Sequence, residues 1–251
     1  MRKLVLCTAL CGCTSSSQEA SSVDLAVTTA AAPMAETTTD LGYTIDLASV
    51  RIGVTQIEFT IEGEVHQKPG PRDTPKPDPA PVFHPGHSAG GEVTGELAGD
   101  HVLVWNGQPQ PELGYAQLII GDYQGANLAF RATTTADGLA ADDPLLGHAF
   151  HLRGTVSKDG VTKNLDIVLD VEPDTRVVGA VFHDVIAAGS QEQLAIEFYP
   201  TDPVEGDTAF DGVDFFALST TDSLQILPGS DAHNLIRREI QTHDHYGVLP
   251  Q

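Results

Sequence analysis

The sequence predicts a mainly β protein, an antiparallel β-sandwich with one or two short C-terminal helices. Stretches in which apolar and polar residues alternate recur at roughly even spacing between residues 43 and 199, and this pattern is typical of strands with one buried face. Turn-forming Gly, Asn and Asp residues separate them, and helical spacing is found only near the C-terminus. With 41% apolar residues, the 251-residue chain can bury one sizeable core.

The first two predicted strands cover residues 43–52 and 54–65, and Gly53 between them suggests a bulge or a turn. Residues 68–81 contain six prolines. Because proline donates no backbone hydrogen bond, this segment is predicted to be an exposed loop.

The passage 83–105 is predicted to alternate turns and strands and to end in the strand Val102–Trp105. Residues 148–156 and 163–171 give the strongest hairpin signal, across the turn that ends at Gly160. Further strands are predicted at 115–122, 127–134, 177–185 and 193–199, and helices at 208–218, with Asp207 as N-cap, and at 231–242.

The N-terminus is predicted to be a targeting segment. Arg2 and Lys3 precede a short apolar run, and Leu10-Cys-Gly-Cys13 follows. This run resembles the lipobox of bacterial lipoproteins, with Cys11 at a position where a small residue is commoner. The resemblance implies lipidation at Cys13 and, because Thr14 follows, an outer-membrane location on the periplasmic or cell-surface side. An ordinary signal peptide is the alternative.

The chain then divides into three predicted parts. Residues 1–12 are a lipoprotein signal peptide, and residues 13–40 are a flexible tether rich in Ser, Thr and Ala. Residues 41–251 are a single β-rich domain that carries the proline-rich loop.

The charge excludes several partners. Lys and Arg total 13 against 35 acidic residues, a formal net charge of −22. Such a surface repels nucleic acid and anionic lipid, so we expect no nucleic-acid partner and membrane contact only through the N-terminal lipid. The three cysteines all lie within the first thirteen residues, which leaves the rest of the chain without thiolate ligands or nucleophiles.

Histidines are the main candidates for a functional site. His84-Pro-Gly-His87 sets two imidazoles around a turn, and His243-Asp-His245 places two on one side if that segment is extended. Imidazole is a ligand that suits copper and zinc. A copper or zinc site built from His84, His87 and His101, completed by His243 or His245, is therefore one hypothesis. Solvent-exposed or hydrogen-bonded histidines without metal are the alternative.

Trp105 adds a second observation, because it follows His101 by four residues. Export, β-rich composition and this short passage resemble copper-binding surface proteins of methane-oxidising bacteria. That resemblance implies one copper held by His101 and a distant histidine, with Trp105 modified to kynurenine. The four-cysteine pattern of a related family is absent from the sequence, and simple packing of Trp105 in the core is the alternative.

An acidic loop offers oxygen ligands for calcium. Asp202, Glu205, Asp207 and Asp211 lie within ten residues, and calcium takes six to eight oxygens. The spacing does not fit an EF-hand, and a polar helix face is the alternative.

No enzyme motif is present. The sequence contains no G-x-S-x-G, no P-loop and no H-E-x-x-H. We therefore predict an exported, lipid-anchored, non-catalytic protein that binds copper or zinc through histidines. The alternatives are a structural or interaction lipoprotein that binds an envelope protein or polysaccharide, and a hydrolase built from carboxylates.

Overall fold

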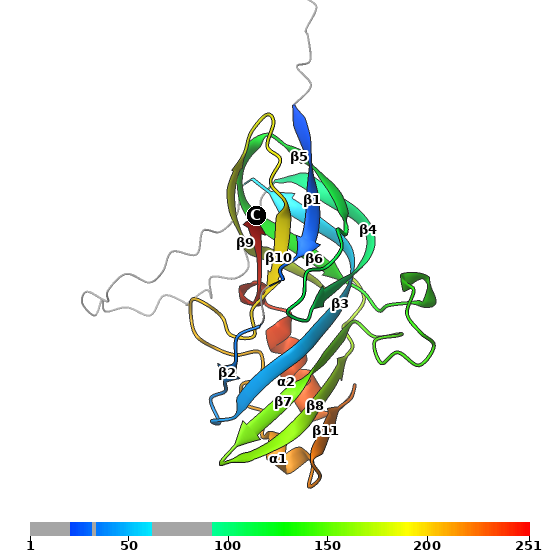
Figure 1. Cartoon of the computed structure of the whole chain (residues 1–251), viewed down its shortest axis with the longest axis vertical. Coiled ribbons are helices and arrows are strands. Elements are labelled where there is room, and N and C mark those ends of the chain that lie inside the picture. Colours follow the sequence, from blue (N-terminus) through cyan, green and yellow to red (C-terminus); the bar gives the residue numbers. More distant parts are fainter. Residues whose placement is uncertain (1–20, 32–33, 62–91) are drawn as a thin grey trace, which may run out of the picture.

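The computed structural model of the chain describes residues 21–31, 34–61 and 92–251. Within these residues, twelve strands form one mixed sheet and two short helices lie near the C-terminus (Figure 1), which confirms the predicted mainly β fold. The strands are β1 (Ser22–Thr29), β2 (Thr37–Thr38), β3 (Thr44–Thr60), β4 (Val93–Trp105), β5 (Gly114–Ile119), β6 (Gly121–Phe130), β7 (Phe150–Lys158), β8 (Val161–Leu169), β9 (Arg176–Ile186), β10 (Leu194–Phe198), β11 (Ser223–Ile226) and β12 (Tyr246–Pro250). The helices are α1 (Phe215–Leu218) and α2 (Asp231–Ile240), with 3-10 turns η1 (Thr135–Asp137) and η2 (His243–His245).

The long strand β3 organises the sheet. Its second half pairs with β4 on one side and β6 on the other, so the order β3-β4-β5-β1-β10-β12-β9-β6 returns to β3. Its first half pairs with β7, which leads to β8 and β11. The closed part leaves its strands with partners on both sides, and closure of this kind removes exposed sheet edges. Figure 1 shows this part above the β7-β8-β11 extension.

The strand pairing is mostly but not wholly antiparallel. Three pairs, β1–β10, β11–β8 and β12–β9, are parallel. The sequence predicts two packed layers of strands. In the structure these layers are opposite sides of one continuous sheet, and their inner faces share a single apolar core.

Strand β1 corrects the predicted tether at 13–40. Residues 22–29 form a strand between β5 and β10, with the Leu25 and Val27 side chains fully enclosed in the core. Val23, Leu25 and Val27 face the core here, a run of only three alternating apolar residues within a segment rich in Ser, Thr and Ala. Its stability comes from two neighbouring strands that are distant in the sequence.

Gly53 marks neither a turn nor the boundary between two strands. It lies inside the 17-residue strand β3, and the bulge falls one or two residues later, between Val54 and Gln56. A Cβ atom at Gly53 would come within 2.6 Å of the Arg131 carbonyl oxygen. The glycine is therefore required by the close approach of the chain that follows β6.

The hairpin predicted across Gly160 is confirmed. β7 and β8 pair in register from Phe150 opposite Leu169 to Lys158 opposite Val161. The two turn residues Asp159 and Gly160 both have positive φ, 51° and 79°, as a type I′ turn requires.

The predicted helix at 208–218 is wrong for most of its length. Only Phe215–Leu218 is helical, and Asp207 is not its N-cap. Instead, the Thr208 amide and hydroxyl both donate to the Asp211 carboxylate, which closes a local turn. Short polar side chains of this kind compete with helix formation.

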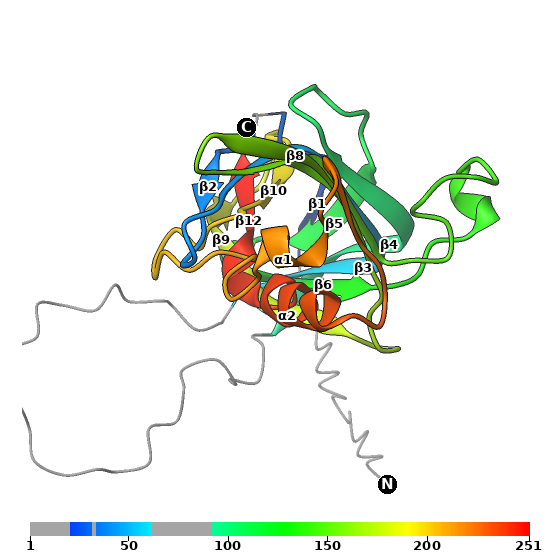
Figure 2. The same ribbon diagram turned by 90° about the horizontal axis from the view of Figure 1, so that it is seen from below.

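The predicted helix at 231–242 is confirmed as α2, Asp231–Ile240. The Ser230 hydroxyl caps its N-terminus by accepting from the His233 amide at 3.1 Å, and Ala232, Ile236 and Ile240 are buried. Seen from below, α1 and α2 lie on the concave side of the sheet (Figure 2). They pack against the inner face of the β7-β8-β11 extension.

Candidate functional site

A pocket with a mostly polar lining lies on the outer face of β3, β7 and β8. Val50, Ile52 and Leu152 point into the core with no exposed surface, and alternation along the strands turns the residues between them outward. The pocket measures about 470 Å³. It is lined by Ser49, Arg51, Asp143, Pro144, His151, Arg153 and Asp166.

His151 lies at the back of this pocket and is only 3% exposed. Its Nε2 lies 2.9 Å from Asp166 Oδ1, and its Nδ1 lies 2.7 Å from Arg51 Nη2. Because a guanidinium can only donate and a carboxylate can only accept, these partners select the neutral tautomer with the proton on Nε2. Burial, the largest effect, lowers the pKa of His151, and the Arg51 charge adds to this against the opposing Asp166 hydrogen bond.

Arg51 joins the histidine to the covering loop, the chain between β6 and β7 (residues 131–149). Its guanidinium donates two parallel hydrogen bonds to Asp143, at 2.8 and 2.7 Å. This hydrogen bonding lowers the pKa of the Asp143 carboxyl. Asp143 Oδ1 also accepts from the Leu145 amide at 2.9 Å, which fixes the covering loop over the histidine.

Arg153 and Asp166 form the open side of the pocket. They are direct register partners on β7 and β8. Asp166 is 35% exposed and uses Oδ1 for His151. Within the described residues, the Arg153 guanidinium makes no hydrogen bond or ion pair, and it is exposed. It is therefore available to a ligand.

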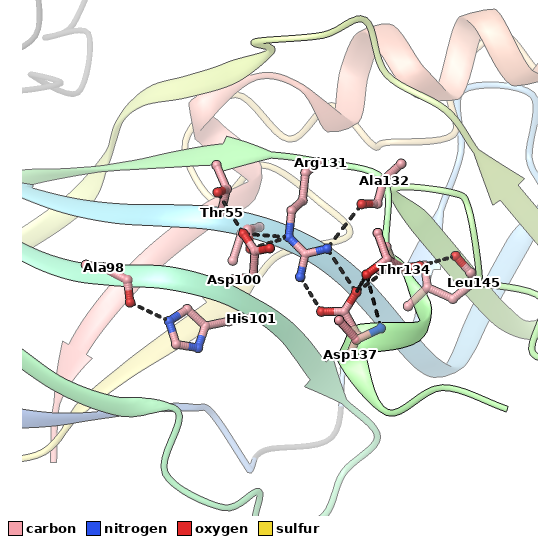
Figure 3. Close-up of polar contacts among 12 residues, drawn as sticks. Thr55, Ala98, Asp100, His101, Arg131, Ala132, Thr134, Asp137 and Leu145 are labelled. Carbon is pink, nitrogen blue, oxygen red and sulfur yellow. Dashed lines mark hydrogen bonds and ion pairs between the residues drawn. The ribbon is translucent and has the colours of Figure 1, made fainter.

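The same covering loop is held at its start by Arg131. Figure 3 shows the Arg131 guanidinium between Asp100 and Asp137. Asp137 accepts two hydrogen bonds from it, one of 2.9 Å to Oδ2, while Asp100 lies 3.1 Å from Nε. These bonds lower the pKa of Asp137. Since all three nitrogens of the Arg131 guanidinium bond to protein groups, its role is to anchor the loop.

A larger groove of about 690 Å³ lies beside Arg131, between β6 and the start of β9. Its two cations, Arg131 and Arg176, are both paired with carboxylates; Arg176 lies 2.7 Å from Glu58. The groove offers no unpaired cation among the described residues. The smaller pocket around His151 is therefore the better candidate despite its size.

The predicted histidine metal site is only partly described. His84 and His87, like Cys13 and the proline-rich loop, lie outside the described residues. His101 lies on β4 with its ring half-exposed, and its Nε2 is 3.1 Å from the Ala98 carbonyl (Figure 3).

The extended conformation that would place His243 and His245 on one side is not found. They form the 3-10 turn η2, His245 is buried, and its Nδ1 lies 2.7 Å from the Tyr199 carbonyl. His243 Nε2 lies 3.1 Å from Asp244. Across residues 21–31, 34–61 and 92–251, no three His, Cys, Asp or Glu side chains are grouped so that they could hold one metal ion.

Trp105 is a core residue. It is 2% exposed, donates its indole N–H to the Ile196 carbonyl at 3.0 Å and packs on Phe198, with ring centroids 5.9 Å apart. These contacts account for the tryptophan by packing alone, and its indole N–H is already engaged.

The four acidic candidates for calcium do not share one shell. Asp211 accepts from Thr208 and from the Asp40 amide at 2.9 Å, and Asp202 accepts from the Val204 amide at 2.7 Å. Glu205 and Asp207 are exposed. The segment is a hydrogen-bonded turn in which backbone donors use two of the four carboxylates.

Sequence reasoning missed Arg51, His151, Arg153 and Asp166. Arg51 and His151 are 100 residues apart, and only the pairing of β3 with β7 makes them neighbours. The one local signal was a charged or polar residue alternating with apolar ones on each strand. That signal also describes any solvent-facing strand.

Among the described residues, no helix is both long and apolar enough to cross a membrane. No family model, curated protein or solved structure matches this chain.

Proposed function

We propose that this protein is an exported, lipid-anchored binding protein that holds a small ligand with an anionic group in the His151 pocket, without chemical turnover. One observation carries the proposal. In a chain with 35 acidic and 13 basic residues, the Arg153 guanidinium stands at a polar pocket with no partner among the described residues. A carboxylate can accept two parallel hydrogen bonds from such a guanidinium.

The arrangement of His151 supports binding over catalysis. Ser49 lines the pocket and is the candidate nucleophile there. Both ring nitrogens of His151 are already engaged by Arg51 and Asp166, so neither is free to take a proton from the serine hydroxyl. The groups around the histidine instead fix a rigid wall, which suits selective binding.

The binding proposal is tested by isothermal titration calorimetry with small carboxylates, acetate and propionate among them. We expect binding that is lost in Arg153→Gln and retained in Arg238→Gln. Arg238 is a matched control because it is 74% exposed and paired with Glu239 outside the pocket. Binding that is equal in the wild-type protein and in Arg153→Gln would contradict the proposal.

A histidine metal site is a second candidate function. His101 supports it, because its Nδ1 has no hydrogen-bond partner among the described residues and its ring is half-exposed. We propose that copper or zinc binds through His101 with His84 and His87. Metal analysis of untagged protein should show metal that is lost in the His84→Ala/His87→Ala variant and reduced in His101→Ala. His183→Ala is the control, since His183 is exposed on β9, and an unchanged stoichiometry in all three variants would rule the site out.

The lipid anchor is a separate part of the proposal. If Cys13 carries lipid, the buried methylenes hold the protein at the membrane at about 0.8 kcal/mol each. Palmitate labelling should be lost in Cys13→Ser and kept in Cys11→Ser. Labelling that persists in Cys13→Ser would assign the anchor to another residue.

A further inference from the structure

We infer that the ligand of the His151 pocket is a small zwitterion, an α-amino acid, with its carboxylate on Arg153 and its ammonium group on Asp166. This inference rests on the proposed binding function and adds the chemical class of the ligand. The supporting feature is a pair of neighbouring opposite charges, Arg153 and Asp166, that do not form an ion pair with each other.

Arg153 and Asp166 occupy directly opposed positions on β7 and β8. Side chains at such positions have Cβ atoms about 5 Å apart, and opposite charges there usually form a cross-strand ion pair. Within the described residues, these two do not form one. Asp166 turns instead to His151, with Oδ1 2.9 Å from Nε2.

Each of these two side chains still has atoms that can bind a ligand in the pocket. No described residue donates a hydrogen bond to Asp166 Oδ2, and none accepts one from the Arg153 guanidinium. The remaining charges are satisfied within the protein, because Arg51 holds Asp143 through two hydrogen bonds. The pocket therefore presents one free cation and one free carboxylate oxygen.

This charge pattern discriminates between ligands. The pocket's two cations and two carboxylates balance, and the His151 ring between them is neutral, as its partners and its lowered pKa require. A simple anion would gain the Arg153 contact but also approach the Asp166 carboxylate. A simple amine would gain the Asp166 contact but would also approach the Arg153 guanidinium. A molecule that carries both charges forms a favourable contact with Arg153 and with Asp166 and has no repulsive one. Avoidance of repulsive contacts contributes to binding specificity.

The size and spacing narrow the class further. A volume of about 470 Å³ falls in the range of small-molecule sites. Arg153 and Asp166 occupy directly opposed positions, and an ammonium group and a carboxylate on the same carbon are the most compact pair of opposite charges that one ligand can present.

The experiment compares three probes of similar size by calorimetry on the whole protein. L-Alanine carries both charges, propionate only the carboxylate, and ethylamine only the ammonium group. We expect L-alanine to bind about tenfold or more tightly than propionate, as one additional charge-assisted hydrogen bond allows, and ethylamine to bind least. Asp166→Asn should reduce L-alanine binding to the level of propionate, and Arg153→Gln should abolish binding of both.

The outcomes separate the two proposals. If propionate binds as tightly as L-alanine and both are lost in Arg153→Gln, the ligand is not a zwitterion while the binding function stands. If neither L-alanine nor propionate binds, both proposals fail. The ratio between the two probes in the wild-type protein decides the matter even if Asp166→Asn does not fold, and Arg238→Gln serves as the control for both variants.

Discussion

The role of His151 comes from tertiary contacts that its sequence neighbours do not reveal. Its ring is held between a donor, Arg51, and an acceptor, Asp166. An imidazolium at this position would have a donor facing Arg51, so the protonated form loses one of the two hydrogen bonds. The neutral ring is thus a structural part of the pocket wall.

His151 should make the fold sensitive to mild acid. Its pKa in the folded protein is lowered from 6.5, so the folded state binds the proton less well than the unfolded state. The stability that this group contributes is complete above about pH 6.5 and decreases as the pH falls below it. We predict that the free energy of unfolding from urea denaturation declines over this range, and less steeply in His151→Gln.

His183→Gln is the control for this measurement, because His183 is exposed and its removal should leave the slope unchanged. The carboxyls of Asp137 and Asp143, whose pKa values are lowered from 3.8 by arginine, act in a separate window below about pH 4. A wild-type slope in His151→Gln between pH 6.5 and 5 would show that this histidine is not the group responsible.

Arg51 supports both His151 and Asp143, so its loss should be costly. The Arg51 and Asp143 side chains are 20% and 17% exposed, and Arg51→Gln leaves a buried acceptor and a carboxylate without their donor. We predict a loss of about 1–3 kcal/mol in the free energy of unfolding. Arg238→Gln, which breaks an exposed pair, should change it by less than about 0.5 kcal/mol.

Among the structural elements, the chain between β6 and β7 is held in place by its contacts with β3. It crosses β3 at Gly53, where the Arg131 carbonyl approaches closely and the Arg131 amide donates to the Gly53 carbonyl at 3.0 Å. Arg131–Asp137 and Arg51–Asp143 then hold it over the outer face. The covering of the pocket is therefore built on one glycine and two arginines.

A side chain at Gly53 should disturb this crossing. An added Cβ would lie 2.6 Å from a backbone oxygen that cannot rotate away, and overpacking of this kind typically costs about 1–3 kcal/mol. We predict that Gly53→Ala lowers the thermal midpoint and increases proteolysis between residues 131 and 149. Gly125→Ala is the matched control, because its nearest atom is the Thr60 hydroxyl at 3.0 Å, a side-chain atom that can move, and an equal effect there would argue against the backbone contact.

For the whole molecule, β1 completes the closed part of the sheet. It separates β5 from β10 and pairs with both. Without it, both neighbours would expose unpaired edges and the core would lose the Leu25 and Val27 side chains. The N-terminal segment is thus part of the domain from residue 22 onward.

Truncation tests this role of β1. A chain that starts at residue 41 should be insoluble or lack a cooperative thermal transition, whereas a chain that starts at residue 21 should unfold cooperatively. Circular dichroism and size-exclusion chromatography distinguish the two. Cooperative unfolding of the shorter chain would mean that β1 is dispensable.

Local patterns in the sequence are sufficient to predict the secondary-structure class and the features that involve neighbouring residues. Alternation identified β7, β8, β9 and β10, the Asp159-Gly160 pair identified the hairpin, and Ser230 with a regular apolar face identified α2. These features depend on residues close together in the chain, so local patterns are sufficient to predict them.

The continuity of β3, the inclusion of β1 and the position of the pocket depend on tertiary contacts. β1 lies beside β10, about 170 residues later in the chain, and Arg51 meets His151 across the β3–β7 pairing. The predicted helix at 208–218 was replaced by a turn because the Asp211 carboxylate accepts from Thr208 and from Asp40. Each of these outcomes depends on partners brought together by strand register, and register is a property of the folded sheet that no local pattern contains.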